Sequence, residues 1–396
     1  MKDLKIFTNN IEQSAKEQID LLLEQKTFKN CKIRIMPDVH AGAGCVIGFT
    51  GDLGDKVIPN IVGVDIGCGL LCVELGNIEL DLEKVDEIIR KNIPSGMNVH
   101  EKPIQQYDFT ELICYPLLKN KNGWLEKSLG SLGGGNHFIE IDVDDENNKY
   151  LVIHTGSRNL GKQVAELYQN EAIHECSYEE EMKLEKQETI NVCKALGLEK
   201  EIQQKLTEIT NKYNGKTKLP KDLCYLQGDS REAYLYDMKL CQEFAILNRK
   251  YIADKICKEL SIKPISEFQC IHNYINFNDN IVRKGAISAR KGEKVIIPMN
   301  MRDGCIIGVG KGNEDWNYSA PHGAGRVMSR NIARQKINME DYKKSMNGIY
   351  TTSVNEETVD EAPMVYKPME EIIEHIKDTV EVKKIIKPIY NFKANE

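Results

Sequence analysis

Side chains of the kinds that bind metal ions are scattered along this sequence, and each stands where an apolar run meets a tight turn. The candidates are one aspartate, one cysteine and four histidines, namely Asp65, Cys68, His137, His154, His272 and His322. Such side chains at tight turns are typical of buried metal or catalytic sites. Since the candidates span residues 65–322, independent domains would each contain an incomplete site. The pattern therefore predicts one intertwined α+β domain over residues 1–396.

The overall composition excludes several classes of protein. Of the 396 residues, 41% are hydrophobic and 29% charged, as in globular proteins with one large core or two ordinary ones. No run approaches the roughly 18 apolar residues of a membrane span, and the N-terminal segment MKDLKIFTNN has no apolar signal core. We expect no membrane insertion or secretion, and a cytoplasmic location. The twelve cysteines include no CxxC pair and are expected to be reduced thiols.

Charge is distributed unevenly along the chain. The net charge of −7 argues against a uniformly basic surface for nucleic acid. Residues 283–336, however, contain eleven lysines or arginines and only four acidic residues. Binding of phosphate groups is therefore expected within that region.

The apolar periodicity alternates between strand-like and helical segments. Residues 30–75 and 268–309 combine β-branched runs with turns and are predicted to form short strands. The segments predicted to form helices are residues 80–92, 162–215, 230–260 and 323–336. A glycine-containing break at residues 196–198 divides residues 162–215, which predicts an inserted helical hairpin.

Asp65 and Cys68 lie three residues apart in VDIGCG, where Gly67 and Gly69 allow a turn that points both side chains at one ion. The alternative is a turn aspartate beside a core cysteine. Ligand softness alone suggests zinc, because a thiolate favours soft or borderline ions. A structural zinc site needs only four ligands, so five candidates and a further accessible histidine favour an open, reactive centre with two ions.

Three of the histidines lie in turns of different composition. His137 follows GGGN, a glycine run that lets a nucleotide approach the backbone, and Glu140 lies three residues further on. A flexible turn with a buried histidine is equally compatible with that segment. His154 leads HTGSRNLG, in which Arg158 and backbone N–H groups form a candidate phosphate site at a helix start. His272 in CIHNYINF is also compatible with an ordinary buried imidazole.

The segment SAPHGAGRVMSR contains the strongest candidate for a catalytic side chain. Pro321 restricts the backbone before His322, and the glycines that follow leave the imidazole unobstructed. Arg326 and Arg330 lie four residues apart, which would place them on one face of the predicted helix. The segment predicts an accessible histidine beside phosphate-binding cations, with a structural histidine as the alternative. The remaining histidines are expected at the surface or in the core: His40, His100, His174 and His375.

Taken together, these segments resemble the RtcB family of RNA-splicing ligases over nearly the whole chain, from MPDVHAGAGCVIG to the C-terminal IYNFKA. The motif order, the seventeen-residue interval between His137 and His154, and HGAGRVMSR carry the resemblance. It implies mixed β-sheets around a central cleft for metal and nucleotide. It also implies an enzyme that uses GTP and Mn²⁺, with two ions expected. The reaction would join RNA ends bearing a 2′,3′-cyclic phosphate or 3′-phosphate to 5′-hydroxyl ends.

The resemblance implies a role for each matched position. The metal ligands would be Asp65, Cys68, His137, His154 and His272. His322 would be the nucleophile that takes GMP from GTP, and Tyr366 would stack on guanine. The other positions matched to guanylate contacts are Asn136, His137, Glu140, His272, Asn273, Pro298, Met301, Cys305, Gly323, Ala324, Gly325 and Lys393.

The sequence departs from the family pattern in three places. Residues 298–302 read PMNMR, followed by Cys305, where the family commonly has Pro-Gly-Ser-Met-Gly and then a serine. Pro321 replaces a small polar residue, and residues 162–215 exceed the length of the shorter forms. The departures are typical of a divergent bacterial branch. Roles in RNA repair and in tRNA splicing are both compatible with such a branch. Whether an archease-like activator takes part is left open by the sequence.

Two other functions are compatible with the same residues. A two-metal phosphoesterase or nuclease would use the same ligands, with His322 as general acid and no need for GTP. A non-catalytic RNA-binding protein would hold a structural metal at the Cys/His site. The ligase is favoured because neither alternative explains HGAGR together with GGGNHFIE.

Overall fold

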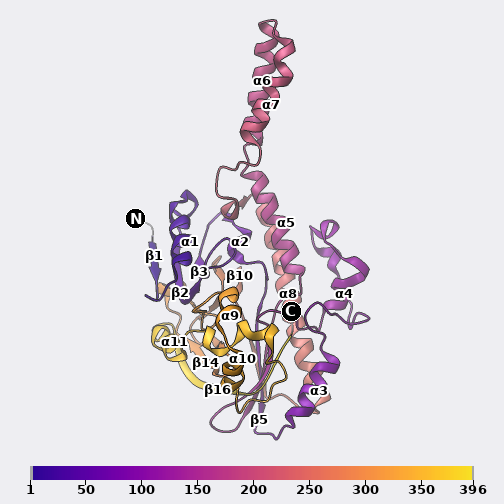
Figure 1. The fold of residues 1–396 in the computed structure, drawn as a ribbon, viewed down its shortest axis with the longest axis vertical. Helices are drawn as coiled ribbons and strands as arrows, with labels where there is room; N and C mark the ends of the chain where they lie inside the picture. Colours follow the sequence, from indigo (N-terminus) through magenta and orange to yellow (C-terminus); the bar gives the residue numbers. More distant parts are fainter. Residues whose placement is uncertain (1–2, 395–396) are drawn as a thin grey trace.

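The structure of this chain, a computed structural model, describes residues 3–394, so residues 1, 2, 395 and 396 of the expected 1–396 domain lie outside the described part. Helices and strands are mixed along the chain in an α+β fold, as expected (Figure 1). The strands are β1 (Asp3–Ile6), β2 (Lys32–His40), β3 (Ile47–Gly51), β4 (Lys56–Val57), β5 (Gly69–Gly76), β6 (Phe138–Val143), β7 (Lys149–Thr155), β8 (Leu226–Gln227), β9 (Ser266–Ile271), β10 (Asn273–Ile275), β11 (Val282–Lys284), β12 (Ala286–Ser288), β13 (Lys294–Asn300), β14 (Gly304–Gly310), β15 (Ser319–Pro321) and β16 (Val380–Lys393). The α-helices are α1 (Gln13–Glu24), α2 (Pro59–Val62), α3 (Leu82–Asn92), α4 (Trp124–Ser128), α5 (Leu160–Glu175), α6 (Glu179–Ala195), α7 (Ile202–Tyr213), α8 (Asp229–Glu259), α9 (Arg330–Lys336), α10 (Met339–Ser345) and α11 (Met369–Ile376).

An antiparallel sheet of seven strands, in the order β13-β14-β16-β6-β7-β5-β9, brings the candidate ligands together. Gly69 at the start of β5 lies opposite both Thr155 of β7 and Ile271 of β9, and Phe138 of β6 lies opposite His154. The candidate ligands at or next to these positions are Cys68, His137, His154 and His272. Strand register therefore brings side chains from distant parts of the sequence together at one end of these neighbouring strands.

A second sheet, in the order β1-β2-β3-β11-β10, is mixed, because β1 and β2 are parallel while its other pairs are antiparallel. The expectation of mixed β-sheets is thus confirmed. Strand β2 contains Asp38 and ends at His40. Strand β15 pairs with β12 and packs against β2, and it ends at Pro321, so His322 leaves the sheet close to Asp38.

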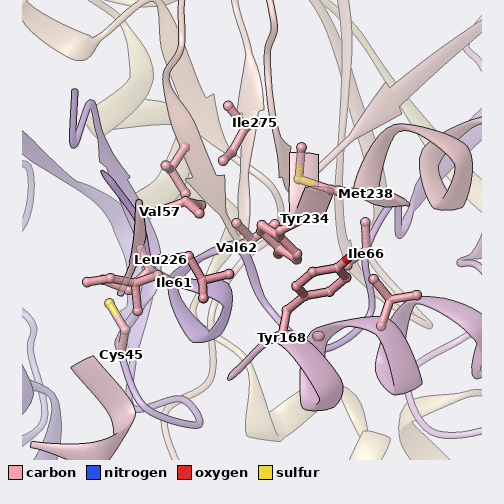
Figure 2. Packing of buried hydrophobic residues seen from close by; sticks show 14 of the residues in the cluster. Cys45, Val57, Ile61, Val62, Ile66, Tyr168, Leu226, Tyr234, Met238 and Ile275 are labelled. Atoms are coloured by element: carbon pink, nitrogen blue, oxygen red, sulfur yellow. The ribbon is translucent and has the colours of Figure 1, made fainter. Parts of the chain in front are cut away.

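A hydrophobic cluster supports the loop that carries Asp65 and Cys68. Ile66, between them, is fully buried with Val62 of α2, Tyr168 of α5, and Tyr234 and Met238 of α8 (Figure 2). The ring centroids of Tyr168 and Tyr234 lie 5.2 Å apart. Because a fully buried large apolar side chain contributes about 1.5–3 kcal/mol, this cluster fixes the loop firmly.

Residues 162–215 contain most of α5 and the paired helices α6 and α7. The α6–α7 pair projects from the rest of the molecule as an arm (Figure 1). Within it only Cys193 and Ile209 are buried, and Lys212 pairs with Glu185 at 2.7 Å. No helix of residues 3–394 combines the length and the apolar character needed to cross a membrane.

The prediction of a helix over residues 323–336 is wrong for residues 323–329. Helix α9 begins only at Arg330, where Ser329 caps it by accepting the backbone N–H of Ile332. Gly325 has a φ of +74°, outside the helical region, and Arg326 forms an isolated β-bridge with Tyr366. Arg326 and Arg330 therefore do not share a helix face.

Candidate metal and nucleotide site

Cys68 lies at the centre of the candidate metal ligands. Its Sγ atom is 3.3 Å from Nε2 of His154 and 3.5 Å from Nε2 of His137. Nε2 of His137 lies 3.2 Å from Oδ2 of Asp65, and Nε2 of His154 lies 3.4 Å from Nε2 of His272. The five side chains form two groups that share Cys68, with Asp65 and His137 on one side and His154 and His272 on the other.

Backbone contacts with α8 hold the loops of this cluster together. Gly67 has a φ of +77°, and a Cβ atom there would lie 2.9 Å from Cα of Gln242. Arg249, which is fully buried, donates from Nη1 to the carbonyl oxygens of Gly67 at 2.9 Å and Thr155 at 2.7 Å. One guanidinium therefore joins the loop before β5 to the end of β7. The sequence alone did not indicate Arg249, because nothing in the helical pattern distinguishes it from a surface arginine.

Burial favours the neutral form of two histidines of the cluster, His154 and His272. It lowers the pKa of His154 and of His272 well below the ordinary value, and the charges of neighbouring histidines lower both further. Nδ1 of His154 lies 3.2 Å from the carbonyl oxygen of Asn136, so the N–H sits there and the Nε2 lone pair faces Cys68. Burial and Asp65 raise the pKa of the Cys68 thiol. Lone pairs converging at these distances repel one another unless a cation lies among them, and the donor set fits a metal ion.

A pocket opens beside the cluster, and His322 lies in its wall. The wall combines the segments around residues 299 and 324 with side chains of β6, β7 and β16. The predicted site residues that line it are Asn136, Glu140, His154, Pro298, Met301, His322, Gly323, Ala324, Gly325, Tyr366 and Lys393. The lining residues that were not predicted from the sequence are His40, Phe138, Met299, Asn300 and Glu361.

Two predicted nucleotide contacts lie behind the pocket wall. Cys305 is fully buried, close to the carboxylates of Glu140 and Asp142. Asn273 connects two loops, because its Nδ2 donates to the carbonyl oxygen of Asp65 at 3.2 Å and its Oδ1 accepts the backbone N–H of Gly285 at 3.0 Å. The structure therefore places both side chains as supports of the site.

Asp38 holds His322 in place. Oδ2 of Asp38 lies 2.7 Å from Nδ1 of His322 and also accepts the backbone N–H of His322 at 3.1 Å. The Asp38 side chain is fully buried, whereas that of His322 is 18% exposed. The hydrogen bond at Nδ1 fixes the tautomer and leaves the Nε2 lone pair free. Sequence analysis missed Asp38, although an aspartate within the apolar strand pattern of MPDVH was a signal.

Glu361 forms ion pairs with the cations of the pocket. This buried carboxylate accepts hydrogen bonds from Lys393 at 2.9 Å and Tyr366 at 2.6 Å, and it pairs with Arg330 at 2.8 Å and Arg326 at 3.4 Å. Burial raises the pKa of Glu361, but Lys393, Arg330 and Arg326 together outweigh it and lower the pKa to about 2. Arg330 also pairs with the buried Asp360 at 2.6 Å, so Lys393, Arg326 and Arg330 exceed the two carboxylates by one charge, which makes this side of the pocket attractive to anions.

Glu140, which lines the pocket, and Asp142 form a buried acidic pair on β6. Burial raises the pKa of Glu140 to about 7, although Lys393 and a hydrogen bond from Asn391 oppose the rise. Burial and the charge of Glu140 raise the pKa of Asp142, against a smaller opposing effect of the Cys305 thiol. Neutral carboxyl groups are therefore favoured here.

The predicted phosphate site in HTGSRNLG is wrong. Arg158 is only 7% exposed and donates to Oγ of Ser131 at 2.8 Å and to the carbonyl oxygen of Gly96 at 2.9 Å. Helix α5 begins at Leu160, after the loop that Arg158 anchors. Arg158 therefore stabilises the loops around the cluster.

The fold and the site define a class of protein in which an Asp/Cys/His cluster lies at the strand ends of an antiparallel sheet, beside a cation-lined pocket. The chain belongs to the RtcB family, because the family model described as "tRNA-splicing ligase RtcB" matches residues 24–124 and 116–394. It is 29% identical to the RNA-splicing ligase RtcB of Escherichia coli, over 96% of this chain and 94% of that protein. It is also 27% identical to the tRNA-splicing ligase RtcB of Nanoarchaeum equitans, over 86% and 83% of the two chains.

Proposed function

We propose that this chain is a GTP- and Mn²⁺-dependent RNA ligase that joins RNA 2′,3′-cyclic phosphate or 3′-phosphate ends to 5′-hydroxyl ends. The observation that carries the proposal is the Asp38–His322 pair at the wall of a cation-lined pocket, beside the Asp/Cys/His cluster. Membership of the RtcB family and the names of its relatives support the same activity.

His322 would act as the nucleophile. Asp38 accepts the Nδ1–H bond, so Nε2 attacks the α-phosphorus of GTP while the bond to pyrophosphate breaks. Asp38 also stabilises the positive charge that develops on the imidazole ring. The product is a phosphoramidate between His322 and GMP, which keeps the guanylyl group activated for transfer.

The cluster around Cys68 would hold the metal ions. Asp65, Cys68 and His137 would bind one ion, and Cys68, His154 and His272 the other. Bound there, the ions would offset negative charge on the phosphate oxygens and on pyrophosphate. The carboxylate and imidazole donors suit manganese, although the thiolate also suits softer ions.

The pocket would hold the guanylate. Tyr366, steadied by its hydrogen bond to Glu361 and by Arg326 5.2 Å from its ring centroid, would stack on the base. The other proposed contacts are Asn136, Glu140, Pro298, Met301, Gly323, Ala324, Gly325 and Lys393. His137 and His272 would act chiefly through the metal ions, and Cys305 and Asn273 through the residues that they support.

The RNA steps would follow in the same pocket, first at the guanylate phosphorus and then at the RNA phosphorus. After opening of any cyclic phosphate, the RNA 3′-phosphate displaces His322 to give an RNA–guanylate anhydride, and the 5′-hydroxyl then attacks the RNA phosphate and releases GMP. Arg326 and Arg330 would neutralise the incoming phosphate. RNA repair or tRNA splicing as the process served, and a cytoplasmic location, stay predictions, and the part of an archease-like activator stays open.

The deciding experiment is labelling of the Mn²⁺-loaded protein with α-labelled GTP, followed by denaturing electrophoresis. Wild type should retain label that acid releases, and His322→Ala should retain none. His174→Ala is the matched control, because the His174 side chain is 73% exposed and lies outside the pocket. Hydrolysis of RNA phosphates without GTP, and no label on wild type, would instead identify a two-metal phosphoesterase.

A further inference from the structure

Two cysteines meet where the arm joins the rest of the molecule. The chain enters the arm after Cys176, the residue that follows α5, and returns through residues 217–224. Ser177 and Thr217 form an isolated β-bridge, and the N–H of Lys218 donates to the carbonyl oxygen of Cys176 at 2.8 Å. The backbone thus holds the two ends of the arm side by side.

The hydrogen bonds of each thiol place it beside the other cysteine. Sγ of Cys176 lies 3.7 Å from the carbonyl oxygen of Tyr225, the residue after Cys224. Sγ of Cys224 lies 3.6 Å from the carbonyl oxygen of Pro220, two residues after Lys218. The two thiols lie close enough for each to shift the pKa of the other: Cys224 lowers the pKa of Cys176, and Cys176 raises the pKa of Cys224.

Cys176 differs chemically from the other cysteines. The hydrogen bond from Cys224 is the main cause that lowers the pKa of Cys176, to about 6, against the effect of burial and with help from Lys218. Every other cysteine with a resolved shift has a raised pKa. The lowered pKa favours the thiolate of Cys176, the form of the side chain that attacks a peroxide.

Cys176 is also within reach of small molecules. It lines a surface cavity together with Lys26, Lys56 and Lys218. Of these cations Lys218 lowers the pKa of Cys176, whereas Glu175, which also lines the cavity, raises it. The cavity shares no residue with the pocket that contains His322, so chemistry at Cys176 is separate from the proposed ligase site.

We propose that Cys176 and Cys224 form an oxidative modification site, at which a small hydroperoxide converts the two thiols into a disulfide that closes the arm at its base. The Cys176 thiolate attacks one peroxide oxygen and the O–O bond breaks, which gives a sulfenic acid and, with hydrogen peroxide, water. The Cys224 sulfur then attacks the Cys176 sulfur, an S–S bond forms, and a second water leaves. Two thiols are oxidised and one peroxide is reduced.

The test is oxidation of the full-length, metal-loaded protein with hydrogen peroxide, followed by blocking of free thiols and peptide mapping without reductant. The expected result is a single linked pair, Cys176 to Cys224, which a reductant reverses. Cys193→Ser is the matched control, because Cys193 is buried within the arm and should leave the linkage unchanged. A folded wild type that forms no such linkage, or forms it at other cysteines first, would overturn the proposal.

A variant of Cys224 tests the two steps separately. In Cys224→Ser the second step is blocked, so sulfenic acid should accumulate on Cys176 and be trapped by dimedone. Wild type should give at least about tenfold less adduct, because Cys224 resolves the sulfenic acid. Equal adduct in the two proteins would show that Cys224 does not resolve Cys176.

Discussion

Oδ2 of Asp38 accepts both the ring Nδ1–H of His322, at 2.7 Å, and its backbone N–H, at 3.1 Å. A single carboxylate oxygen therefore sets the backbone, the ring orientation and the tautomer of the proposed nucleophile. Because Asp38 is fully buried, these constraints hold before any substrate arrives.

Asp38→Asn should keep the side-chain shape but remove the charge that stabilises the imidazolium, and it favours the wrong tautomer. We expect the rate of GMP transfer to His322 to fall about 10²–10⁴-fold. Rapid-quench labelling with α-labelled GTP measures this rate. Asp55→Asn, at an exposed position, should label at the wild-type rate, and an unchanged rate in Asp38→Asn would exclude a role for the pair.

Cys68→Ala should weaken both proposed metal sites, whereas Asp65→Asn should weaken only the one that also contains His137. The reason is that Cys68 lies between the two groups of ligands. We expect at least about a tenfold loss of Mn²⁺ affinity in Cys68→Ala, measured as metal content after equilibrium dialysis. Cys257→Ser should retain its metal, since Cys257 lies in a separate hydrophobic cluster. Equal effects of the Cys68 and Asp65 substitutions would contradict a shared ligand.

Glu361→Gln should lower the free energy of unfolding by about 3–5 kcal/mol at neutral pH, because it leaves the buried Lys393 without its counter-charge. Since folding lowers the pKa of Glu361 from 4.5 to about 2, its stabilisation is complete above pH 4.5 and is lost as the pH falls toward 2. Urea denaturation at several pH values should show wild type and variant converging over this interval. A constant difference would assign the effect to packing.

Asp142→Asn should have the opposite pH dependence. Folding raises the pKa of Asp142 and of Glu140, so the stability of the neutral pair is fully present at low pH and is lost as the pH rises through the folded pKa values. The variant removes one of the two acids. Its stability relative to wild type should therefore improve between pH 5 and pH 8, by roughly 1 kcal/mol or more, in thermal melts. A difference that does not vary with pH would argue that Asp142 is ionised throughout.

Replacement of the arm, residues 177–217, by a short Gly/Ser linker should leave metal content and labelling with GTP unchanged. Only Cys193 and Ile209 are buried in α6 and α7, and the β-bridge between Ser177 and Thr217 brings the ends of the deletion together. Labelling is measured as for wild type. Loss of labelling in a folded deletion variant would show that the arm contributes to the site.

Local pattern was sufficient for much of the fold and for most candidate ligands. The strand patterns at residues 30–75 and 268–309, the helix α8 and the break within residues 162–215 all follow from apolar periodicity and glycine placement. Helix α9 is an exception, because it begins later than apolar periodicity predicts. Gly325 has a positive φ, and Arg326 forms a β-bridge with Tyr366. The helix therefore begins only after Ser329, its N-cap.

The sequence by itself determined which chemical groups are present and where they leave regular structure, since Cys68, His137 and His272 each adjoin a strand end within a readable pattern. Only the tertiary structure decided their partners. Asp38 reaches His322 across 284 positions of sequence, and Lys393 reaches Glu361 across 32. Such pairs depend on which strands lie side by side, and the burial that makes their charges consequential arises only when the sheets and helices pack.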